Sequence, residues 1–177
     1  EHLARPLVSM EPLHHGMFWP AALLVMVTRL AGHKGIDLLC YIGERLMQRR
    51  VQLLVIGTGE EKYEWFLQYL QDRFRGRAAA CLEFDPQKAN LAYAGADIYL
   101  MPSKSEPCGL SQMIAMRYGT LPIVRETGGL RDSVQPYNRF TGEGTGFSFA
   151  NFNAYELADT IRRALALYHD DHDAYCR

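Results

Sequence analysis

The amino-acid sequence predicts one domain of the α/β class, a doubly wound parallel sheet with helices on both of its faces. Segments that are apolar throughout alternate along the 177-residue chain with segments that have a helical period. Strands that are apolar throughout are typical of a sheet that is buried on both faces. Alternation of strands and helices requires crossover connections, and these make neighbouring strands parallel.

The same patterns place the individual elements. Six apolar segments are predicted to be strands: residues 23–28, 51–56, 78–84, 97–101, 121–124 and 146–149. Five periodic segments are predicted to be helices: residues 36–50, 60–74, 86–94, 109–117 and 155–168. Ligands of a doubly wound sheet bind at the carboxyl ends of its strands, so the loops after the strands are the places to search for a site.

Composition narrows the functional class. Hydrophobic residues make up 48% of the chain and charged residues 22%, as in ordinary globular proteins, and the formal net charge is -1. A nearly neutral chain has no basic field that would attract nucleic acid or an anionic membrane. The longest apolar run, residues 21–27, is far shorter than the roughly 20 residues that cross a bilayer.

The cysteines and the two ends of the sequence complete the outline. The four cysteines contain no CxxC pair, which favours reduced thiols in a cytoplasmic protein over a zinc site or a disulfide framework. The start of the sequence lacks the pattern of a secretory leader, so a leader is expected to be absent or removed. Residues 1–20 hold three prolines and no sustained period, and we expect a linker there, with the domain over residues 21–177. The stretch 168–173 is rich in histidine and aspartate, and is predicted to be a solvated helix end rather than a metal site; residues 169–177 resemble a cut end.

Two cations follow the first predicted strand. Arg29 and Lys34 come after its carboxyl end and before a predicted helix, where they can hold a diphosphate beside the helix N-terminus. The same residues are also consistent with two solvated loop charges, and this loop alone does not decide between these readings. After the second strand, the sequence Gly57-Thr58-Gly59 favours a simple tight turn, because it lacks the GxGxxG spacing of a dinucleotide site.

The loop after the fourth strand has the densest concentration of candidate residues. Glu106 can accept hydrogen bonds from sugar hydroxyls, and it is followed at once by a proline and, soon after, a predicted helix start. The amides of Gly109, Leu110 and Ser111 at that start favour an anion. Cys108 can act as a nucleophile, but a small buried residue is the favoured interpretation, because no histidine stands near it in the sequence.

Two further loops offer weaker candidates. Phe84 ends the third predicted strand, where its ring can stack on a base or simply lie at the rim of the core. Thr127 and Gly128 follow the fifth strand, and the glycine permits the backbone to approach a ligand closely.

These loops form part of a larger pattern of six motifs in a fixed order. The motifs are Thr28-Arg29-Leu30 with Lys34-Gly35-Ile36-Asp37, Tyr93-Ala94-Gly95-Ala96-Asp97, Met101-Pro102-Ser103, Glu106-Pro107-Cys108-Gly109-Leu110, Arg117-Tyr118-Gly119-Thr120 and Thr127-Gly128-Gly129-Leu130. Together they resemble the bacterial glycogen synthase and starch synthase family, over residues 23 to 168. The resemblance implies the carboxyl-terminal, nucleotide-sugar-binding half of a retaining GT-B glucosyltransferase, with a Rossmann-like sheet. The amino-terminal domain, with its Lys-Thr-Gly-Gly-Leu loop, and the final helices have no counterpart in this sequence.

The resemblance also implies an activity and a role for each candidate. Glucose would pass from ADP-glucose to the non-reducing end of an α-1,4-glucan with retention of configuration, without a metal or other cofactor. The resemblance implies that Arg29 and Lys34 hold the diphosphate, and that Glu106 binds the glucose with help from the backbone at Cys108 and Gly109. It further implies that the amides of Leu110 and Ser111 meet the distal phosphate and that Phe84 stacks near the adenine. Thr127 and Gly128 would lie near the donor cleft.

The sequence leaves two alternative functions to consider. Without a partner domain, the chain is also consistent with a module that binds ADP or ADP-glucose and transfers nothing, because closure of two domains assembles such sites. A dinucleotide-dependent oxidoreductase is disfavoured, since the first loop has Arg29 and Lys34 in place of a glycine fingerprint. The sequence does not separate ADP-glucose from UDP-glucose as the donor.

Overall fold

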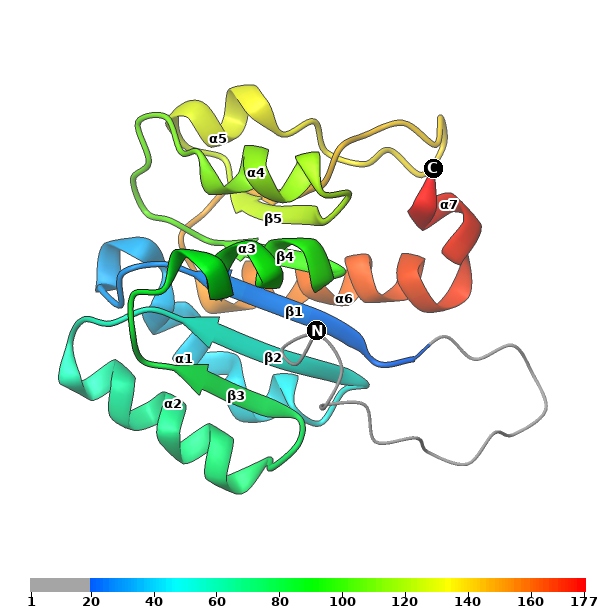
Figure 1. Ribbon diagram of the computed structural model, residues 1–177. Coiled ribbons are helices and arrows are strands. Elements are labelled where there is room, and N and C mark those ends of the chain that lie inside the picture. The colour runs from blue at the N-terminus through cyan, green and yellow to red at the C-terminus, as the bar shows by residue number, and fades with distance from the viewer. Residues whose placement is uncertain (1–19) are drawn as a thin grey trace.

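A computed structural model describes residues 20–177 of the chain. It contains one six-stranded sheet in the order β3-β2-β1-β4-β5-β6, and every neighbouring pair is parallel (Figure 1). The strands are β1 (Ala22–Val27), β2 (Val51–Ile56), β3 (Ala78–Cys81), β4 (Ile98–Met101), β5 (Leu121–Arg125) and β6 (Phe147–Phe149). The predicted fold class, a doubly wound α/β sheet, is confirmed.

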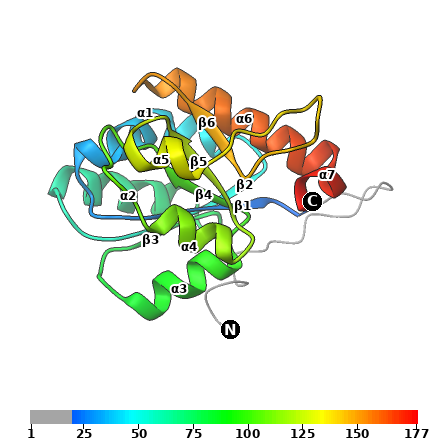
Figure 2. The same ribbon diagram turned by 90° about the horizontal axis from the view of Figure 1, so that it is seen from above.

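Helices cover both faces of this sheet. They are the 3-10 turn η1 (Gly32–Lys34), α1 (Ile36–Leu46), α2 (Glu61–Arg73), α3 (Pro86–Gly95), α4 (Ser111–Arg117), α5 (Gly128–Ser133), α6 (Ala154–Asp170) and α7 (His172–Cys176). Figure 2 shows α3 and α4 on the opposite side of the sheet from α1 and α6. No helix within residues 20–177 is both long enough and apolar enough to cross a bilayer.

The strand β1 shows how the sequence builds the two layers. Its side chains alternate between the faces of the sheet, as the two-residue period of a strand requires. Leu24 and Met26 pack in the core under α1, α2 and α6, whereas Leu23 and Val25 pack in the core under α3 and α4. Because both faces are covered, the strand is apolar at every position, which is why its sequence shows no alternation.

The strand order places a crevice at the carboxyl ends of the two central strands, β1 and β4. The strands β2 and β4 lie on either side of β1, so the connections that leave β1 and β4 run in opposite directions along the sheet. The loops at the carboxyl ends of β1 and β4 therefore separate and leave room between them. Ligands of open α/β sheets bind at this kind of position.

Several predicted boundaries differ from the structure. The third strand ends at Cys81 rather than at residue 84, because Asp85 caps α3 and the chain must turn before Pro86. The first helix ends at Leu46 rather than at residue 50, and α4 begins at Ser111 rather than at residue 109. The short helices α5 and α7 were not predicted at all.

The predicted solvated helix end at 168–173 is confirmed in part, because α6 ends at Asp170 and the side chains of Asp170, Asp171 and Asp173 are exposed. Two tyrosines of the carboxyl-terminal region nevertheless pack against the domain. The rings of Tyr168 and Tyr175 are buried, and the Tyr175 hydroxyl donates a hydrogen bond to the carbonyl of Asp97 at 2.5 Å. Within residues 20–177, no group of three histidine, cysteine or acidic side chains is placed to hold a metal ion. The predicted linker, apart from Pro20, lies outside the described residues.

Candidate functional site

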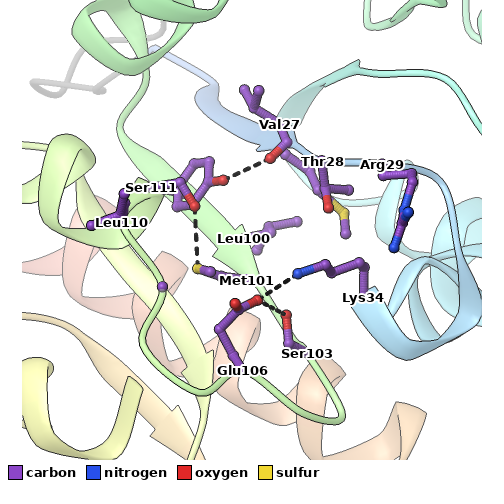
Figure 3. A pocket seen from close by; sticks show the side chains of 13 residues that line it. Val27, Thr28, Arg29, Lys34, Leu100, Met101, Ser103, Glu106, Leu110 and Ser111 are labelled. Atoms are coloured by element: carbon purple, nitrogen blue, oxygen red, sulfur yellow. Dashed lines mark hydrogen bonds and ion pairs between the residues drawn. The ribbon is translucent and has the colours of Figure 1, made fainter. Parts of the chain in front are cut away.

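A cavity of about 420 Å³ lies at the carboxyl ends of β1 and β4 (Figure 3). Three segments line it: the end of β1 with the loop after it, the end of β4 with the loop after it, and the start of α4. The lining includes six candidates from the sequence, namely Arg29 and Lys34 after β1, and Glu106, Gly109, Leu110 and Ser111 between the end of β4 and the start of α4. The structure therefore brings the two most informative loops into one hollow.

An ion pair crosses this cavity. The Lys34 ammonium lies 2.7 Å from Oε2 of Glu106, and their side chains are 24% and 13% exposed. Lys34 ends η1, and Glu106 lies in the loop that follows β4, so 72 residues separate the partners along the chain. A lysine and a carboxylate this close and this shielded from water neutralise each other in the absence of a ligand.

Glycine allows the two loops to meet. Gly35 follows Lys34 and has a φ of +80°, which L side chains rarely adopt. A Cβ atom added to Gly35 would lie 2.2 Å from the carbonyl oxygen of Pro102. The amide of Lys104 also donates a hydrogen bond to the carbonyl of His33 at 2.9 Å. The first loop is thus packed directly on the loop that carries Glu106.

Arg29 supplies the second positive charge. Its side chain is exposed, and its Nη2 lies 3.5 Å from Nε2 of His33. Figure 3 shows Arg29 on the same side of the cavity as Lys34. The site therefore contains two cations on one side and one carboxylate opposite them.

Sequence reasoning missed part of the lining. Ser103 is almost fully buried, and its Oγ lies 3.5 Å from Oε2 of Glu106. Tyr99 lies deep in the cavity, where its hydroxyl donates to the carbonyl of Val27 at 3.0 Å and burial raises the pKa of the phenol. The position of Tyr99 within a strand gave no indication that it lines a site. Ser103 directly follows the fourth strand, and this position could have identified it as a candidate.

Four of the sequence candidates do not line this cavity. Phe84 stands on the loop after β3 with 90% of its surface exposed, and Thr127 and Gly128 lie at the start of α5. Cys108 is exposed, so the expectation that it is buried is wrong. The roles of these four residues in binding a ligand stay predictions.

The glycines after β5 have a structural reason of their own. A Cβ on Gly128 would lie 2.2 Å from the carbonyl oxygen of Glu106, and one on Gly129 would lie 2.3 Å from that of Cys108. The amide of Gly129 donates to the carbonyl of Pro107 at 3.1 Å. This turn therefore supports the backbone of the loop from 106 to 108.

The arrangement suits an anion bound next to a polyol. Two cations attract negative charge, and the first amides of α4 lack partners within that helix. A carboxylate accepts hydrogen bonds from hydroxyl groups. In the part of the chain that the structure describes, Glu106 is the one acidic side chain that lines the cavity.

Comparison with known proteins agrees with this geometry. The sequence model of the family described as "Glycosyl transferases group 1" matches residues 20–176. The chain belongs to this family. Among members with curated sequences, a glycogen synthase from Clostridium botulinum strain Eklund 17B is 51% identical over 148 residues, which are 84% of this chain and 31% of that protein. A glycogen synthase from Geobacillus thermodenitrificans is 52% identical over 146 residues, or 82% of this chain and 30% of that protein.

A solved structure extends the similarity of this group 1 glycosyl transferase chain. The catalytic domain of starch synthase IV from Arabidopsis thaliana, bound to ADP and acarbose, superposes with a TM-score of 0.81 and 32% identity. The superposition covers 88% of this chain and 33% of that one. The chain thus spans about a third of the length of the relatives that it matches. The resemblance to glycogen and starch synthases that the sequence motifs indicated is confirmed.

Proposed function

We propose that this chain is the nucleotide-sugar-binding domain of a glucosyltransferase that extends an α-1,4-glucan from ADP-glucose. The observation that carries the proposal is the pairing of Lys34 with Glu106 inside the cavity at the ends of β1 and β4. One partner matches the charge of a diphosphate, and the other matches the hydroxyls of a hexose. A nucleoside diphosphate sugar contains both groups side by side.

Lys34 and Arg29 would act on the leaving group. Negative charge grows on the diphosphate as the bond between glucose and phosphate breaks. Cations and helix-start amides that are already in place stabilise this charge more in the transition state than in the ground state, and that difference accelerates the reaction. The amides of Leu110 and Ser111, which line the same cavity, would meet the distal phosphate.

Glu106 would hold the glucose, assisted by the backbone at Cys108 and Gly109. We propose retention of configuration, with the acceptor hydroxyl attacking the face that the diphosphate leaves. A double displacement of the hydrolase type needs two carboxylates about 5 Å apart. Among residues 20–177, Glu106 is the one carboxylate in the lining of this cavity, and the proposed same-face substitution requires no second one.

ADP would be the nucleotide. Phe84 lies in the loop that follows the carboxyl end of β3, and its exposed ring is free to stack on a base. The starch synthase that superposes on this chain was solved with ADP bound, which supports the choice of adenine over uracil. Thr127 and Gly128 would lie on the far side of the donor, behind the loop that carries Glu106.

A second domain would complete the enzyme. The chain spans about a third of its curated relatives, and we propose that residues 21–177 form the carboxyl-terminal member of a two-domain enzyme. An amino-terminal domain would then bring the glucan acceptor to the donor. The enzyme would work in the cytoplasm, in keeping with the free thiols at all four cysteines.

Two assays test this function. The first is calorimetric titration of the chain with ADP, UDP and glucose 1-phosphate, in which ADP is expected to bind most tightly. The second follows glucose incorporation from ADP-glucose into glycogen, and we expect none from this chain alone, because a single domain cannot close over its donor. Failure of every nucleotide to bind at millimolar concentration would contradict the donor site, and tighter binding of UDP would overturn the choice of nucleotide.

A further inference from the structure

Arg125 holds the loop that carries Glu106, although it does not line the cavity. It is the last residue of β5, and its guanidinium donates hydrogen bonds to three backbone carbonyls. Nε reaches the carbonyl of Ser103 at 3.1 Å, and Nη2 reaches that of Lys104 at 2.5 Å. Nη1 reaches the carbonyl of Ala150 at 3.0 Å, in the segment after β6.

These contacts hold the loop at the two residues that touch Glu106 and the loop of Lys34. The Ser103 side chain lies 3.5 Å from the Glu106 carboxylate, and the amide of Lys104 is bonded to the carbonyl of His33. The two carbonyls that Arg125 grips therefore belong to the residues that connect Glu106 to the loop of Lys34. On its other side, the loop rests on the amide of Gly129, which reaches the Glu106 carbonyl at 3.3 Å.

The geometry of these contacts favours arginine over lysine. A guanidinium has five N–H donors in a rigid plane and bonds to several carbonyls at once, whereas a lysine ammonium is a single point on a flexible stem. No carboxylate in residues 20–177 forms an ion pair with Arg125. Its N–H groups donate to backbone carbonyls instead, which indicates that Arg125 holds the loop rather than serving as a solvated surface charge.

We infer that Arg125 is a positioning residue, which sets the distance between the Glu106 carboxylate and Lys34 by clamping the carbonyls of residues 103 and 104. The inference rests on the proposed function, in which Glu106 binds the sugar and Lys34 the diphosphate. Loss of the clamp then affects the sugar half of the site more than the phosphate half. ADP-glucose binding falls, and ADP binding changes little.

The experiment is calorimetric titration of the 177-residue chain with ADP and with ADP-glucose. The variants are Arg125→Ala and Arg125→Lys, and the matched control is Arg131→Ala, an exposed arginine on α5. We expect Arg125→Ala to raise the Kd of ADP-glucose about tenfold and that of ADP less than threefold, with partial recovery in Arg125→Lys and no change in the control.

Each other outcome has a defined meaning. Equal losses for both ligands, or no loss for either, would overturn the positioning role. Unfolding of both variants, seen by circular dichroism, would also overturn it, because Arg125 would then support the fold rather than the loop. Absence of binding by the unaltered chain would instead contradict the proposed function, so the two failures are distinguishable.

Discussion

The Lys34 ammonium and the Glu106 carboxylate form an ion pair 2.7 Å apart across a cavity that is open to solvent. Each group therefore occupies the place where the other would meet a ligand. Under the proposed function, a diphosphate would compete with Glu106 for Lys34, and a hexose would compete with Lys34 for Glu106. A nucleotide sugar would engage both groups at once.

Removal of the carboxylate charge tests this competition. In Glu106→Gln, Lys34 loses its resident partner, so ADP is expected to bind more tightly by about 1 kcal/mol, or roughly fivefold. The added affinity that the glucose of ADP-glucose provides should fall in the same variant. Calorimetric titration with both ligands measures the two changes, with Glu143→Gln, an exposed loop residue, as the control. Weaker ADP binding in Glu106→Gln would show that the carboxylate does not compete.

The exposed ring of Phe84 gives a second prediction. Phe84→Ala is expected to leave the free energy of unfolding within about 0.5 kcal/mol of the original, because the side chain is 90% exposed. Loss of stacking on adenine should weaken ADP binding by about 1–3 kcal/mol and leave pyrophosphate binding unchanged. The matched control is Phe140→Ala, which removes another exposed phenylalanine. If both variants bind ADP as the unaltered chain does, Phe84 has no part in the site.

Two glycines with the same backbone conformation distinguish the stability cost of a left-handed φ from the cost of a steric clash. Gly35 and Gly119 have φ values of +80° and +81°, but only Gly35 has a neighbour within 4 Å of an added Cβ, namely the backbone of Pro102. Gly119→Ala is expected to cost roughly 1–2 kcal/mol of stability from the left-handed conformation alone. Gly35→Ala should cost more than about 4 kcal/mol, since the loops at the site must separate. Urea unfolding measures both, and equal losses would mean that the close approach at Gly35 does not contribute.

A buried carboxyl predicts how stability depends on pH. Burial raises the pKa of Asp97, against smaller opposing effects of the Leu23 amide, His172 and Tyr168. The folded chain therefore holds this proton more tightly than the unfolded chain, whose Asp has a pKa of about 3.9. The contribution of Asp97 to the free energy of unfolding is present below that value and is lost as the pH rises through the raised pKa.

The variant Asp97→Asn removes this titration. Asparagine keeps an acceptor for the Leu23 amide, which bonds to Oδ2 of Asp97 at 2.8 Å. The stability of Asp97→Asn relative to the original should therefore increase between pH 4 and pH 7, in urea unfolding at each pH. Asp173→Asn, an exposed substitution on α7, should show no such trend. A difference that is constant or decreases with pH would contradict the effect of burial.

The sequence was most informative about the sheet. The strands β1 and β2 are buried at nearly every position, so their residues are apolar throughout in β1 and at every position except Gln52 in β2, a pattern that is visible in the sequence. The helix α5 could not be found in this way, because it begins with two glycines, which are poor helix formers. It is held instead by tertiary packing, in which Leu130 lies against Val124.

In the candidate site, too, some features could be predicted from the sequence and others could not. Lys34 and Glu106 were found because each follows a strand, and the topology then brings the ends of parallel strands together. Their pairing at 2.7 Å, and the support of Glu106 by Ser103, required coordinates. Arg125 acts on carbonyls 21 and 22 residues away in the sequence, and no local pattern records such a contact.

The decisive measurement for the donor site is a crystal structure of the chain with ADP bound. We expect the distal phosphate within hydrogen-bond distance of the Lys34 ammonium and of the amides at the start of α4, with Lys34 and Glu106 further apart than 2.7 Å. ADP bound elsewhere on the chain, with the ion pair between Lys34 and Glu106 intact, would contradict it.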